Sequence, residues 1–166
     1  MSFTIRTAHE ADAHDLAPNL RLADLRECEG FGVNPLASLL TAVSDGLETL
    51  TLVGRDDEVL GMFGLGIRHP QWNLTTIWLL GTETLVRDLG YRKKFWIESK
   101  QYVNDWCAEQ GTIGNMVHAT NLVHIAWLQR LQFKINITHP ILSPKGHRYY
   151  PFVRSHICAS PPPSQQ

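Results

Sequence analysis

The sequence is poor in cysteine and in long hydrophobic runs. Its three cysteines, Cys28, Cys107 and Cys158, are odd in number, lie far apart and lack the paired spacing that zinc sites favour. We therefore expect reduced thiols in a cytoplasmic protein, with Cys107 in a packing role. No stretch approaches the roughly 20 apolar residues of a membrane span, and no basic segment followed by an apolar run opens the chain. We expect neither a standard export signal nor a membrane-spanning helix.

The chain also has almost no net charge. The formal charge is −1 with eight neutral histidines, which gives no indication of a nucleic-acid or acidic-membrane partner. Any anion site must therefore be local. A hydrophobic share of 43% with five tryptophans, against 19% charged residues, indicates an ordered globule. At 166 residues we expect one domain over 1–159, followed by a mobile proline-rich tail at 160–166.

The hydrophobic periodicity predicts strands and helices in a defined order. Alternating or continuous apolar runs predict the strands, and apolar residues at helical spacing predict the helices. Asn34 followed by Pro35 is typical of a helix start. Strands are expected at 3–7, 49–54, 59–68, 75–82, 112–119, 133–138 and 147–154, and helices at 11–29 (broken near Pro18), 34–46, 91–109 and 121–132.

The stretch ETLVRDLGYRKKF, residues 83–95, lies between the fourth strand and the long third helix. A helix N-terminus binds phosphate through free N–H groups and the helix dipole, and a glycine allows close approach. Cations at a helix start oppose the dipole, so they need another justification. The stretch is either an anion site or the solvated face of a helix. Its candidate anion ligands are Arg87, Gly90, Arg92, Lys93 and Lys94.

The element order, with this glycine-bearing turn after the fourth strand, resembles the GNAT superfamily of CoA-dependent N-acetyltransferases over residues 3–154. The family turn is Arg/Gln-x-x-Gly-x-Gly/Ala; Arg87 and Gly90 match it, and Arg92 stands where a small residue is usual. A second match is the twelve-residue spacing from Asn121 to Phe133. Two positions depart from that second pattern: Gln132 replaces a glycine, and Leu128 stands where many members have a tyrosine acid.

The resemblance implies an α/β (α+β) GNAT fold. Its central twisted sheet has six to seven mostly antiparallel strands, splayed between strands 4 and 5, with about four flanking helices. It also implies acetyl-CoA as co-substrate, with phosphates on the turn and its cations. The splayed end of the fourth strand, near Thr84, Leu85 and Val86, is expected to offer backbone groups to pantetheine. Asn121 is expected to bind pantetheine, to cap its helix, or to do both.

Amine acetylation needs a base for the ammonium proton and often an acid for the leaving thiolate. The resemblance places Glu83, at the end of the fourth strand, as the first candidate base. His118 and His124 are expected to face the same cleft, either as catalytic groups or as structural histidines. With Leu128 in the tyrosine position, Tyr149 and Tyr150 are late candidates for the acid.

Two functions remain open from the sequence. The first is transfer of an acetyl group from acetyl-CoA to an amine of a small molecule or protein. The second is a catalytically degenerate GNAT-fold protein that binds a host enzyme or virion component, which the altered phosphate turn at Arg92 and the missing tyrosine at Leu128 favour. The chain also resembles the small GNAT-like proteins of short-tailed bacteriophages. No metal, nucleic acid or membrane partner is expected, and the acceptor loops expected at 24–36, 68–75 and 138–148 identify no acceptor.

Overall fold

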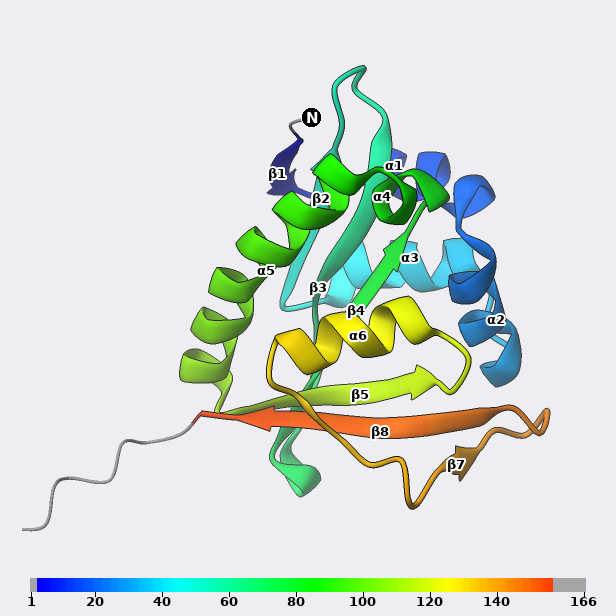
Figure 1. The fold of residues 1–166 in the computed structure, drawn as a ribbon, viewed down its shortest axis with the longest axis vertical. Helices are drawn as coiled ribbons and strands as arrows, with labels where there is room; N and C mark the ends of the chain where they lie inside the picture. The colour runs from blue at the N-terminus through cyan, green and yellow to red at the C-terminus, as the bar shows by residue number, and fades with distance from the viewer. Residues whose placement is uncertain (1–2, 157–166) are drawn as a thin grey trace, which may run out of the picture.

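One twisted sheet forms the centre of the protein, whose computed structural model describes residues 3–156 (Figure 1). Its eight strands follow the order β1-β2-β3-β4-β5-β8-β6, and β7 pairs with β8. All pairs are antiparallel except β4 with β5. The strands are β1 Thr4–Thr7, β2 Glu48–Val53, β3 Val59–His69, β4 Leu74–Gly81, β5 Thr112–His118, β6 Lys134–Ile135, β7 Ile141–Leu142 and β8 Arg148–Ser155.

Helices cover both faces of this sheet. Successive side chains of a strand point to opposite faces, so β3 contributes to two cores. Phe63 packs against Phe95 of α5, and its neighbour Met62 packs with α1 and α3. Figure 1 shows α5 and α6 together on one face. The helices are α1 Glu10–Leu16, α2 Leu22–Phe31, α3 Pro35–Asp45, α4 Glu83–Arg87, α5 Leu89–Gln110 and α6 Leu122–Arg130, with 3₁₀ turns at Ala17–Asn19 and Pro70–Trp72.

The parallel pair β4 and β5 separates toward its carboxyl end. Only Thr75–Ile113 and Thr76–Gly114 are paired, and the Asn115 side chain then donates a 3.0 Å hydrogen bond to the Ile77 carbonyl oxygen. Beyond that point the two strands diverge (Figure 1). We call the space between Gly81 of β4 and His118 of β5 the β4–β5 wedge.

The sequence prediction is confirmed for the fold class and differs at particular elements. Asn34 caps α3 by accepting a 3.0 Å hydrogen bond from the Ala37 N–H, as expected. The main difference is α4, because a strand end was expected there. Thr82 starts this short helix by accepting from the Leu85 N–H at 3.3 Å, and Leu85 is buried. The described residues thus form more elements than predicted, six α-helices and eight strands.

The predictions about a membrane span, the C-terminal tail and the last strands have different outcomes. In the described range, no helix is both long enough and apolar enough to cross a membrane. The tail at 160–166 lies outside the described residues. The strand expected at 133–138 is reduced to the two-residue β6, whereas the expected terminal strand is present as β8.

Candidate active site in the β4–β5 wedge

A buried ion pair at the start of α2 occupies the β4 side of the wedge. Arg21 donates to both oxygens of Asp24, at 2.6 and 2.9 Å, and the two side chains are 5% and 0% exposed. Asp24 also accepts a 2.8 Å hydrogen bond from the Gly81 N–H, while the Arg21 N–H donates to the Gly81 carbonyl at 3.0 Å. Both backbone groups of the last β4 residue are therefore satisfied by the start of α2.

Asn121 connects this ion pair to α6. Its Oδ1 caps the helix by accepting from the His124 N–H at 3.3 Å and also accepts from Arg21 at 3.1 Å. Its Nδ2 donates to Glu27 at 3.1 Å and to Asp24 at 3.4 Å. The capping interpretation of Asn121 is confirmed, and the same side chain bridges α2 and α6 across the wedge.

Glu27 lies at the centre of the wedge. Its Oε1 accepts hydrogen bonds from the His118 N–H at 2.9 Å and from Asn121 at 3.1 Å, and its side chain is 14% exposed. Burial raises the pKa of Glu27 to about 7, and the negative charge of Asp24 adds to the rise. This carboxyl group therefore exchanges its proton near neutral pH, which is the property required of a general base.

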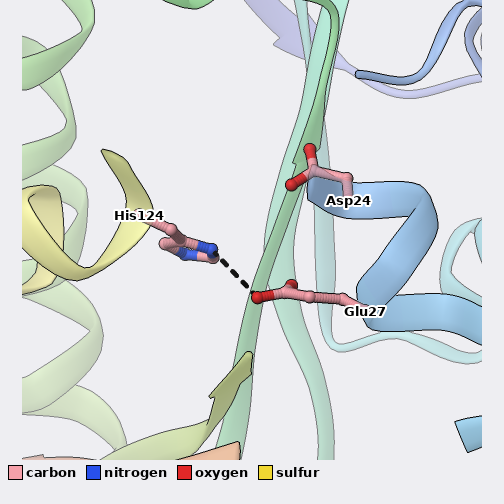
Figure 2. A group of neighbouring side chains, drawn as sticks. All are labelled: Asp24, Glu27 and His124. Atoms are coloured by element: carbon pink, nitrogen blue, oxygen red, sulfur yellow. Dashed lines mark ion pairs between the residues drawn. The ribbon is translucent and has the colours of Figure 1, made fainter. Parts of the chain in front are cut away.

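His124 faces Glu27 from the opposite helix (Figure 2). Its Nδ1 lies 3.9 Å from Glu27 Oε1, and it makes no hydrogen bond within residues 3–156. Burial lowers the pKa of His124 to about 3, with a smaller contribution from the charge of Arg21. His124 is thus a neutral imidazole beside the carboxyl group, so the two form no ion pair at neutral pH.

Asp24, Glu27 and His124 have the ligand types of a metal site, with candidate ligand atoms within 4.8 Å of one another (Figure 2). Asp24 is not free to bind a cation, however. Arg21 and Gly81 direct three hydrogen bonds at its two oxygens, and the guanidinium already balances its charge. The trio is therefore better suited to holding a proton than a metal ion.

His118 is tied into the neighbouring structure. The Thr120 N–H donates to its Nδ1 at 3.2 Å, so Nε2 carries the proton and donates to His147 Nδ1 at 3.1 Å. Burial lowers the pKa of His118, and His147 and Arg26 lower it further. His118 reaches Glu27 through its backbone N–H, which makes it a positioning residue for that carboxyl group.

The structure places Glu83 outside the wedge. It is the first residue of α4, its side chain is 47% exposed, and it pairs with Arg87 at 3.2 Å. With Asp15 and Glu58 it lines a separate surface hollow. The predicted position of Glu83 beside His118 and His124 is therefore wrong, because the chain turns into α4 directly after Thr82.

The predicted pantetheine segment is helical as well. In α4 the Leu85 N–H bonds to Thr82, the Thr84 carbonyl accepts from the Asp88 N–H at 3.0 Å, and the Val86 carbonyl accepts from Arg92 at 3.4 Å. The prediction that Thr84–Val86 lie on an open strand edge is wrong.

The N-terminus of α5 is capped by its own chain. Asp88 Oδ1 accepts hydrogen bonds from the Gly90 and Tyr91 N–H groups at 2.8 and 3.0 Å. These are N–H groups that a phosphate at this turn would contact. Lys94 points away, donating to the Phe3 carbonyl at 2.6 Å, whereas Lys93 is exposed. A phosphate at this helix start must therefore replace a carboxylate.

We expect Asp88→Ala to lower the free energy of unfolding by about 1 kcal/mol, because two N–H groups of α5 lose their acceptor. Asp88→Ser should retain most of that stability, since serine also caps helices. Urea unfolding of the two variants measures the difference. Equal stability of the alanine and serine variants would contradict the capping role.

Two cavities flank the wedge. On the α5–α6 side, a space of about 20 Å³ is bounded by Leu85, Arg92, Trp96 and His124, among others. The Arg92 and Arg130 guanidinium carbons lie 5.4 and 4.2 Å from the Trp96 ring centroid. On the other face, a cavity of about 420 Å³ lies between α2, α3 and the sheet, and both Glu27 and His124 line it.

Solved structures show which known architecture this is. No family model and no curated protein matches the sequence. A GNAT-family acetyltransferase from Bacillus anthracis superposes with a TM-score of 0.66 at 9% identity, over 93% of this chain and 95% of that one. A GCN5-related N-acetyltransferase from Kribbella flavida gives 0.64 at 19% identity, over 93% and 98%. A ribosomal-protein-alanine N-acetyltransferase from Brucella melitensis gives 0.62 at 17%, over 92% and 99%.

The chain has the GNAT fold. Within that fold, sequence reasoning named Asn121 and His124 as residues of this region but did not name Arg21, Asp24 and Glu27. The spacing of three was the available signal, because it puts Asp24 and Glu27 on one face of α2, with Arg21 at the residue before the helix. The helix expected at 11–29 was predicted from its apolar positions only.

Proposed function

We propose that this GNAT-fold chain transfers an acyl group from a CoA thioester to an amine, with Glu27 as general base. The observation that carries the proposal is the Glu27 carboxyl group. It stands in the β4–β5 wedge with a pKa of about 7, on the wall of a cavity large enough for an acceptor. The N-acetyltransferases among the structural neighbours support the same class of reaction.

In the proposed reaction, Glu27 takes a proton from the acceptor ammonium, which frees the nitrogen lone pair. The nitrogen attacks the thioester carbonyl carbon; a C–N bond forms, the C–S bond breaks, and the sulfur leaves as thiolate. The nitrogen then loses its second proton, and a proton converts the thiolate to free CoA. The products are an amide, a thiol and one released proton. The thioester supplies the activated acyl group, and the chain supplies position and the base.

The proposed acid step does not use a tyrosine on α6. Leu128 is fully buried there. Tyr149 donates its hydroxyl to the Glu27 carbonyl oxygen at 2.7 Å, and burial raises the pKa of Tyr149 to about 12. We assign Tyr149 a positioning role, because it holds α2 where Glu27 reaches the wedge. A thiolate is a good leaving group, and solvent can protonate it.

We propose that the CoA phosphates bind on the α5–α6 face, near Arg92, Lys93 and Arg130, with Trp96 between the two arginines. Arg87, Gly90 and Asn121 remain part of this proposed cofactor surface. Because the space on this side is only about 20 Å³, the proposal requires side chains of its lining, such as Arg92, to move when the thioester enters.

Titration calorimetry and thermal unfolding with acetyl-CoA test the proposal. A ligand at 100 times its dissociation constant adds about 2.7 kcal/mol of stability, so the melting temperature should rise. Lys93→Ala should weaken binding and Lys100→Ala should not, because both are exposed on α5 but Lys100 lies about three turns from the helix start. Release of free thiol with an amine panel measures transfer. Absence of any acetyl-CoA binding at millimolar concentration would overturn the proposal.

A second function is favoured by one specific observation. In a complex with CoA, the N–H groups of Gly90, Tyr91 and Gly81 would be expected to face the cofactor. Here they already donate hydrogen bonds to Asp88 and Asp24. A chain that never binds CoA would keep those bonds and act as a binding protein with the GNAT fold, for example toward a host enzyme or virion component. Failure to bind acetyl-CoA, with an intact fold, is the result that this function predicts.

A further inference from the structure

The 420 Å³ cavity between α2, α3 and the sheet has the size and lining of a small-molecule site. Ligand pockets commonly span roughly 300–1,000 Å³ and are mostly apolar with a few polar groups. This one accommodates an aromatic ring with a short side chain. Its apolar walls include Phe31, Leu39, Ala42, Trp78, Met116 and Phe152.

Two residues of its lining, Trp78 and His124, each carry a buried polar atom without a partner. Trp78 Nε1 and His124 Nδ1 make no hydrogen bond to any residue in the described range, and neither atom is exposed to solvent. Neither atom therefore faces the open space of the cavity, and the polar character of the site comes from the carboxylates of its lining.

The charge of the cavity selects for a cation. Glu27 lines its inner end, and exposed Asp45 lies on its lining as well. The hydrogen bonds to Glu27 both use Oε1, and within residues 3–156 none reaches Oε2. No lysine or arginine is among the described residues that line the cavity. An ammonium group therefore meets acceptors and negative charge here. An anion would be repelled by the same negative charge.

We infer that this cavity, the α2–α3 pocket, binds a small primary amine with an aromatic or bulky apolar body, its ammonium at Glu27. The inference rests on the proposed acyl transfer for the fate of the amine, since bound nitrogen at Glu27 is placed for deprotonation. Binding itself requires only the pocket and its charges.

Calorimetric titration of the full chain without CoA tests the binding. We expect phenethylamine to bind at least tenfold more tightly than phenethyl alcohol, which has the same ring and no charge. Hydrocinnamate, an anion of similar size, should bind more weakly still. Equal affinity for the amine and the alcohol would overturn the assignment of Glu27 as the ammonium site. Absence of heat with all three probes would overturn the pocket.

Variants locate the site. Glu27→Gln should lose at least tenfold in phenethylamine affinity and keep its affinity for phenethyl alcohol, whereas Glu29→Gln, exposed on the same helix, should change neither. Ala42→Trp should block both ligands, with Ser44→Trp on the exposed side of α3 as its control. If Ala42→Trp does not fold, the charge series and the Glu27 variant still decide the matter.

The pocket and the proposed function fail separately. Phenethylamine binding without acetyl-CoA binding overturns acyl transfer and keeps the pocket. Acetyl transfer to other amines, without binding of any probe, overturns the pocket and keeps acyl transfer.

Discussion

Glu27→Gln is expected to lower the rate of amine acylation by roughly 10²–10⁴-fold, the range for loss of a general base. Glutamine is nearly isosteric and still accepts the hydrogen bond that the His118 N–H makes to Oε1 at 2.9 Å. The fold and the packing of α2 should therefore survive, while proton transfer and the negative charge at Glu27 are lost. Steady-state release of free CoA thiol measures the rate, and Glu29→Gln on the same helix is the matched control.

The pH profile separates this role from a structural one. The pKa of Glu27 is raised to about 7, so the deprotonated, active form increases as pH rises, and the rate should increase through pH 7 and then level off. The charged groups around this carboxyl are Arg21 and Asp24, and the neutral rings are His118 on β5 and His124 on α6. Burial lowers the pKa of both histidines, that of His124 to about 3, so neither ring accounts for an inflection near 7. A profile without an inflection near 7 in the unmodified chain would count against Glu27.

Arg21→Met is expected to lower the free energy of unfolding by about 3–5 kcal/mol, the usual cost of leaving one member of a buried ion pair alone. Asp24 is fully buried, and Arg21 supplies two hydrogen bonds and the only opposite charge in contact with it among residues 3–156. Without the guanidinium, this carboxyl must remain charged in a poor environment or take up a proton. Urea unfolding with linear extrapolation measures the loss.

Two companion variants identify the cause of that loss. Arg26→Met removes an exposed arginine from the same helix and should change stability by less than about 0.5 kcal/mol. Adding Asp24→Asn to Arg21→Met should recover part of the loss, because asparagine carries no charge and still accepts from the Gly81 N–H. A double variant no more stable than Arg21→Met alone would show that packing, and not charge, causes the effect.

Local sequence patterns anticipated most elements because the residues that decide them are near neighbours. Asn34 and Pro35 start α3, and the apolar run before Thr82 forms β4, as expected. Segment 83–87 was assigned wrongly for a physical reason. Its helix depends on Thr82 as a cap and on burial of Leu85 against the sheet, and burial is not visible in a short sequence window.

The same distinction applies to the residues of the wedge. Asn121 and His124 were predicted to lie there because they belong to a recognisable strand-to-helix sequence, whereas Glu27 lies on a helix whose partners are distant in the chain. Its carboxyl group meets the His118 N–H ninety-one residues away. The raised pKa comes from that enclosure, so no pattern around position 27 encodes it.

The sequence by itself determined most of the order of strands and helices, because periodicity and capping are local properties of the chain, and this order resembled the GNAT fold. Only the tertiary structure decided which side chains meet in the wedge. Divergence of β4 from β5 opens the wedge, and α2 fills it with Arg21, Asp24 and Glu27. In this enclosure Asp24 forms an ion pair with Arg21, and burial raises the pKa of Glu27. Both effects depend on residues that lie far apart in the chain and meet only in the folded protein.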